Sequence, residues 1–156
     1  MMWRIPQTHI LVVGLCVGLS GCAGISGSVP GVRGASQKAL HLDEWLAAHP
    51  IPHDQEMAIT ELGRTDSSSM HVVQIRRREG PHLHKSHDLV VILQRGHGIL
   101  RLGSKTLVMR PGSVAAIPRG VVHAFVNTSR QPAAALVVFS PPFDDVDTVP
   151  VVDVQR

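Results

Sequence analysis

Between residues 56 and 143 the sequence consists of short apolar runs, rich in β-branched residues, which glycine and proline separate. The runs span residues 57–62, 70–75, 89–93, 98–102, 105–109, 113–117, 123–126 and 134–139. A spacing near ten residues, with turn residues between the runs, is typical of an antiparallel sandwich or barrel. No long helical pattern lies between them, which argues against a parallel α/β fold. We therefore predict an all-β domain over residues 56–143.

A short helix and a linker are predicted before the β-rich domain, over residues 40–55. Leu42, Trp45 and Leu46 fall on one face of such a helix, and Pro50 stops it. Trp45 is expected to anchor this helix on the domain.

The segment after the last run is predicted to be a surface loop and a frayed end, with residues 144–156 as a C-terminal tail. It carries Asp144, Asp145 and Asp147 close together. No glycine turn spaces these carboxylates as in a calcium loop, so we expect them to be solvated.

Residues 1–21 are predicted to form a signal peptide. The apolar run at residues 10–19 is too short to span a bilayer but suits the central region of an export signal. The run ends in Leu19-Ser20-Gly21-Cys22, which resembles the lipobox of bacterial lipoproteins. The resemblance implies cleavage before Cys22, acylation of its sulfur with chains such as palmitate, and anchoring to a membrane of the cell envelope, outside the cytoplasm. Residues 22–39, rich in glycine and serine, are then predicted to be a flexible tether.

The composition argues against a nucleic-acid partner. The formal net charge is +3, the basic residues are scattered along the chain, and aromatic residues make up only 3%. A nucleic-acid binder concentrates Lys and Arg on one face and adds aromatic side chains on which bases stack.

Two histidines in the segment 80–96 suggest half of a metal site. His82 and His84 are two positions apart, so on a strand both side chains point to the same face. Imidazole is a good ligand for zinc, copper, iron and nickel.

A second motif begins thirty residues after His82, at Gly112. It has the form Gly112-x5-Pro118-x-Gly120-x2-His123-x3-Asn127, in which the Pro-x-Gly step predicts a tight turn and His123 enters the next strand. This motif resembles the second signature of the cupin superfamily, and residues 80–96 resemble the first. The resemblance covers about residues 57–140.

The resemblance implies a single-domain cupin, an antiparallel β-barrel or jelly roll with a short helix before it. It also implies that His82, His84 and His123 bind one divalent metal ion at the barrel centre. The ion is not specified; zinc, manganese, copper, nickel and iron all suit the histidines.

The fourth ligand is where the sequence departs from the cupin pattern. The register usual in cupins places the metal-binding carboxylate at Leu89, whose side chain cannot bind a metal. Asp88 is our expected fourth ligand, provided that a β-bulge turns it inward. The alternatives are His87, with Asp88 orienting it, or no fourth protein ligand at all.

The function expected from these features is a membrane-tethered, metal-binding cupin that acts on a small molecule. Open positions on the ion suit a non-haem dioxygenase, or an isomerase in which the ion polarises a carbonyl group. The alternative is a cupin lipoprotein that binds or senses a small ligand without turnover. No catalytic or ligand-binding residue is assigned, and a homodimer is a family expectation.

Overall fold

The computed structural model describes residues 39–152. The predicted signal peptide, Cys22 and residues 22–38 of the predicted tether lie outside the described residues. One helix, α1 (Leu42–Ala48), precedes the strands. The first sheet contains, in spatial order, β1 (Met57–Arg64), β2 (Ser69–Ile75), β9 (Ala133–Ser140), β4 (Asp88–Arg95) and β7 (Val114–Ile117). The second sheet contains β10 (Thr148–Pro150), β3 (Arg78–His84), β8 (His123–Asn127), β5 (Gly98–Leu102) and β6 (Lys105–Met109).

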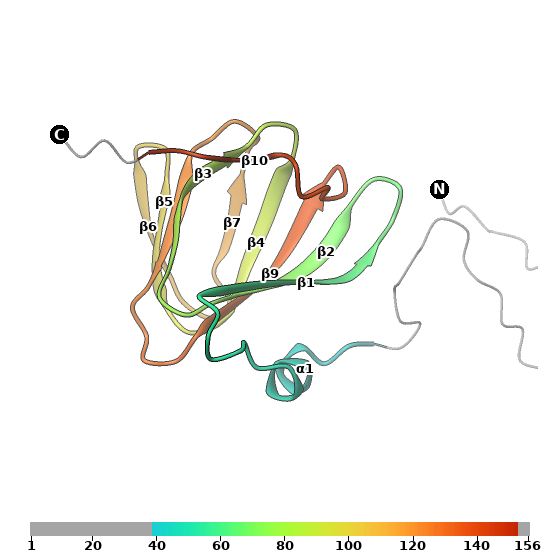
Figure 1. The fold of residues 1–156 in the computed structure, drawn as a ribbon, viewed down its shortest axis with the longest axis vertical. Coiled ribbons are helices and arrows are strands. Elements are labelled where there is room, and N and C mark those ends of the chain that lie inside the picture. Colours follow the sequence, from blue (N-terminus) through green and yellow to red (C-terminus); the bar gives the residue numbers. More distant parts are fainter. Residues whose placement is uncertain (1–38, 153–156) are drawn as a thin grey trace, which may run out of the picture.

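The two sheets face each other as the walls of a barrel (Figure 1), and every paired strand in them runs antiparallel to its neighbour. Non-consecutive neighbours such as β9 between β2 and β4, and β8 between β3 and β5, give the crossed connections of a jelly roll. Each of the eight predicted runs lies on a strand. The predicted antiparallel barrel is confirmed.

The core lies between the sheets and draws side chains from both. Buried members alternate along each strand with outward residues, because successive side chains of a strand point to opposite faces. The core residues are Val73, Ile75, Leu89, Leu93, Leu100, Met109, Ala115, Ile117, Phe125, Ala133, Val137, Phe139 and Phe143.

Helix α1 covers part of the outer face of the first sheet, where it lies under β1 and β2 in Figure 1. Leu46 packs against Val72 and Ala134, and Trp45 joins this cluster at its edge. Burial of a leucine side chain contributes about 1.5–3 kcal/mol, so Leu46 is the main anchor and Trp45 supports it. No helix within residues 39–152 has the length and apolar character needed to cross a membrane.

The turns around the second motif form as predicted. Gly112 has a φ angle of 85° and Gly120 one of 74°, a conformation that strains any residue with a Cβ. The Gly120 amide donates to the carbonyl oxygen of His84 at 2.7 Å. This hydrogen bond links the turn before His123 to the strand that carries His82 and His84.

The prediction for the end of the chain was wrong in one important part. Asp144 and Asp145 are exposed, but Asp147 is 5% exposed. Strand β10 follows it at once and pairs with β3, placing Thr148 opposite His84 and Pro150 opposite His82. The segment 147–150 therefore adds an edge strand to the second sheet, beside the strand that carries His82 and His84.

Candidate metal centre

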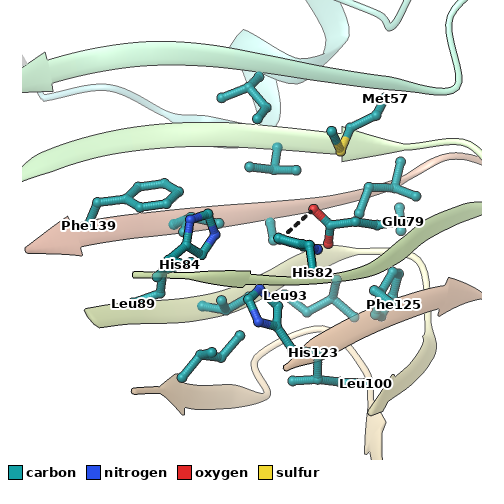
Figure 2. Close-up of a pocket in the computed structure, with 18 of the residues that line it drawn as sticks. Met57, Glu79, His82, His84, Leu89, Leu93, Leu100, His123, Phe125 and Phe139 are labelled. Carbon is teal, nitrogen blue, oxygen red and sulfur yellow. Dashed lines mark ion pairs between the residues drawn. The ribbon is translucent and has the colours of Figure 1, made fainter. Parts of the chain in front are cut away.

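Three buried histidines from two neighbouring strands come together in the barrel. His82 and His123 are directly opposite each other in the β3–β8 ladder, and His84 lies two residues further along β3. Each histidine offers one ring nitrogen within a set whose atoms all lie within 4.8 Å of one another. Figure 2 shows the three rings turned towards one another. The structure thus brings together the three histidines that the two motifs singled out.

Backbone carbonyl groups fix the tautomers of two of these rings. The Nδ1 atom of His82 lies 3.0 Å from the carbonyl oxygen of Gly80, and that of His123 lies 3.0 Å from the carbonyl oxygen of Val121. A carbonyl oxygen only accepts, so Nδ1 carries the proton in both rings. Each Nε2 atom is then left with a free lone pair, which is how metal-binding histidines are commonly oriented.

The electrostatics of the cluster favour the neutral form of His84 and His123. Burial, reinforced by the neighbouring His82, lowers the pKa of His84 to about 4. Burial also lowers the pKa of His123 to about 4, although its hydrogen bond to Val121 acts in the opposite direction. A histidine must be neutral to bind a metal. His84 and His123 can therefore bind a divalent ion at neutral pH without first losing a proton.

Asp88 does not join this cluster, and its expected role as fourth ligand does not match the structure. Its side chain is 49% exposed and forms an ion pair with Arg119, which lowers the pKa of Asp88 to about 2. Leu89 points inward and is 5% exposed. The β4 strand does contain a register shift, but it falls between Leu93 and Arg95. A shift at that end of the strand leaves the alternation at Asp88 unchanged.

His87, the alternative fourth ligand, is 1% exposed and engages both ring nitrogens elsewhere. Its Nδ1 atom pairs with the Asp147 carboxylate, and its Nε2 atom lies 3.0 Å from the carbonyl oxygen of Pro142. Burial lowers the pKa of His87, but these two acceptors outweigh it and the pKa is raised overall. Both nitrogens thus act as donors, and the ring is held as a buried cation.

Asp147 connects this ion pair to the histidine cluster. Burial raises the pKa of its carboxyl group, but hydrogen bonds from His87 and Ser86 bring it well below the ordinary value. Ser86 donates to the Oδ1 atom from its amide at 2.9 Å and from its hydroxyl at 2.8 Å. The Oδ2 atom lies 3.7 Å from Nδ1 of His84. The Asp147 carboxylate thus lies between the rings of His87 and His84.

Glu79 is a polar residue of the site that the sequence analysis missed. Its Oε1 atom lies 3.6 Å from Nε2 of His82 (Figure 2), and burial raises the pKa of its carboxyl group. Residues three apart on a regular strand face opposite sides, but β3 shifts register against β8 between Glu79 and His82. Such a bulge adds a residue and turns Glu79 to the inner face. The Gly80-Pro81 step is the sequence signal that could have indicated it.

A cavity of about 120 Å³ adjoins the three histidines. Its polar lining comprises the histidines, Glu79 and Thr148, and the remaining lining is apolar. Leu89, at the position where the usual pattern has a carboxylate, is part of that apolar lining. The site therefore combines converging nitrogen donors with a small apolar space.

Comparison with known proteins identifies related sequences and folds. The family model for the cupin domain matches residues 69–139. An uncharacterized protein of Aquifex aeolicus strain VF5 is 36% identical over 95 residues, which cover 61% of this chain and 78% of that protein.

Two solved structures have a similar fold at low sequence identity. TT1209 from Thermus thermophilus has a TM-score of 0.58 and 23% identity, over 67% of this chain and 98% of that one. Pac13, a nucleoside dehydratase from Streptomyces, has a TM-score of 0.53 and 16% identity, over 62% of this chain and 78% of that one. At these identities the likeness concerns the fold alone.

Proposed function

Because the chain belongs to the cupin superfamily, we propose that it is a metal-dependent enzyme for a small molecule, tethered to a membrane of the cell envelope. In this proposal His82, His84 and His123 hold one divalent ion. The observation that carries it is the convergence of three buried imidazoles beside a cavity.

The chemistry of the proposed site follows from its ligand count. Three histidine ligands leave coordination positions open, so a bound ion would supply Lewis-acid or oxygen chemistry to a substrate in the cavity. The apolar walls exclude water from around the substrate, which strengthens electrostatic interactions there. Glu79 is placed to contact the polar group of a substrate beside His82. Dioxygenation and isomerisation are the two reaction classes that such a site supports.

Catalysis is tested by supplying the metal-loaded protein with thiols, phenols and diketones. We expect oxygen consumption, or a rearranged product without oxygen consumption, with at least one of these classes. The first result assigns a dioxygenase and the second an isomerase. Binding without turnover across the whole panel would instead support a ligand-binding or sensing cupin.

The membrane tether is proposed from the Leu19-Ser20-Gly21-Cys22 segment. Several acyl chains on one cysteine anchor a protein stably, whereas one chain alone is marginal. We expect radioactive palmitate to label the protein expressed in a bacterium, and the Cys22→Ser variant to remain unlabelled. Equal labelling of both proteins, or of neither, contradicts the anchor. Cys16→Ser is the matched control and should retain the label, because Cys16 lies inside the predicted signal peptide.

A further inference from the structure

We infer that Glu79 is the fourth protein ligand of the ion, and that the bulge in β3 supplies the carboxylate which Leu89 cannot provide. The inference rests on the proposed function, because it concerns the ion that His82, His84 and His123 would hold. A carboxylate has two oxygen atoms. Binding through Oε1 therefore leaves Oε2 of Glu79 to contact the polar group of a substrate.

Glu79 and His82 face each other with two electron-pair donors. The carbonyl oxygen of Gly80 holds the proton of the His82 ring on Nδ1, so Nε2 carries a lone pair. The Oε1 atom of Glu79 lies 3.6 Å from that Nε2 atom (Figure 2), which is too long for a hydrogen bond. Two ligand atoms at about 2.1 Å from a tetrahedral ion are about 3.4 Å apart. The separation therefore suits two ligands of one cation.

No other contact holds the Glu79 carboxylate away from the cluster. Within residues 39–152 it accepts no hydrogen bond, and His82 is its only ion-pair partner. The carboxylate is not among the atoms that lie within 4.8 Å of one another, so it has to turn towards His84 and His123 to join them. Rotation about the bonds of a free glutamate side chain allows this movement.

The other carboxylates near the cluster already have partners. Asp88 pairs with Arg119 at the surface, and Asp147 pairs with His87. Among the described residues that line the cavity, Glu79 is the only carboxylate, and none is a lysine or an arginine. Burial of a carboxylate without a cation is costly, and a bound divalent ion is the largest positive charge that such a site can receive. The ion and Glu79 thus compensate each other.

The first test compares the affinities of the wild-type protein and Glu79→Gln for manganese and zinc. Glutamine keeps the size of the side chain and removes its charge. Carboxylate oxygen suits manganese, whereas imidazole suits zinc, so we expect a loss of about 100-fold for manganese and about 10-fold for zinc. Competition with a chromophoric chelator measures both. Unchanged affinities, or equal losses for the two metals, would overturn the inference.

A second glutamate gives the matched control. Glu61 is exposed on β1 and does not line the cavity, so Glu61→Gln should bind both metals as the wild type does. Urea denaturation of the metal-free proteins checks the fold. Glu79→Gln should be at least as stable as the wild type, because it removes a buried charge that has no cation beside it. If this variant does not fold, infrared spectroscopy of the wild type decides.

The infrared difference spectrum between zinc-loaded and zinc-free protein reports on the ligand directly. A carboxylate that binds an ion shifts its stretching bands, whereas three histidine ligands alone leave them in place. We expect a shifted carboxylate band in the wild type and in Asp88→Ala, and none in Glu79→Gln. A zinc-loaded wild type without this shift, or a shift that persists in Glu79→Gln, overturns the inference alone. A wild type that binds no metal contradicts the proposed function together with it.

Discussion

His82→Ala is expected to abolish stoichiometric metal binding. His82 is central to the cluster: its ring centroid lies 4.1 Å from that of His123 and 5.1 Å from that of His84. Loss of a residue that merely orients a ligand lowers metal affinity by about 10–100-fold, so loss of a ligand should lower it by more than about 100-fold. Elemental analysis after loading and desalting should find about one ion per wild-type chain and almost none in the variant.

Two alanine variants provide matched controls for this measurement. His97 is exposed and lies outside the cluster, so His97→Ala removes a histidine without touching the site. Asp88→Ala removes the carboxylate that the sequence pointed to, and it should retain the metal because Asp88 pairs with Arg119. A wild-type protein that stays metal-free after loading contradicts the site. Loss of metal in Asp88→Ala would bring Asp88 back as a ligand.

The three histidines were predictable because their signals are local. The spacing of His82 and His84 places both on one face of a strand, and the Pro118 and Gly120 turn directs His123 into the next strand. The family resemblance implied that His123 joins His82 and His84 around one ion, and the pairing of β3 with β8 places His82 directly opposite His123.

The carboxylates were not predictable because bulges and long-range contacts set their positions. A bulge was predicted at Asp88, but the β4 register shift falls between Leu93 and Arg95, in the pairing with β9. A second bulge in β3 turns Glu79 inward, and no periodicity of the sequence shows it. Asp147 meets His87 across 60 positions of the chain. Its place depends on the pairing of β10 with β3, and a three-residue strand gives little signal of its own.

Asp147→Asn is expected to lower the free energy of unfolding by about 3–5 kcal/mol, since it breaks a buried ion pair and leaves one partner uncompensated. The side chains of His87 and Asp147 are 1% and 3% exposed, so water cannot replace the lost contact. An asparagine can still accept the hydrogen bonds of Ser86 at one oxygen, but its amide group would then face the Nδ1 proton of His87. Urea denaturation of the metal-free protein near pH 6 measures the effect without the contribution of an ion.

The His87–Asp147 ion pair also predicts that the free energy of unfolding decreases at both low and high pH. The pKa of Asp147 is lowered in the folded protein, so its contribution is lost as the pH falls below the unfolded value of about 4. The pKa of His87 is raised, so its contribution is lost as the pH rises from about 6.5 through the folded value. Both decreases in the free energy of unfolding should become smaller in Asp147→Asn. Asp144→Asn, at an exposed carboxylate on the same segment, should remain within about 1 kcal/mol of the wild type. Equal losses in the two variants would show that the His87–Asp147 pair does not stabilise the fold.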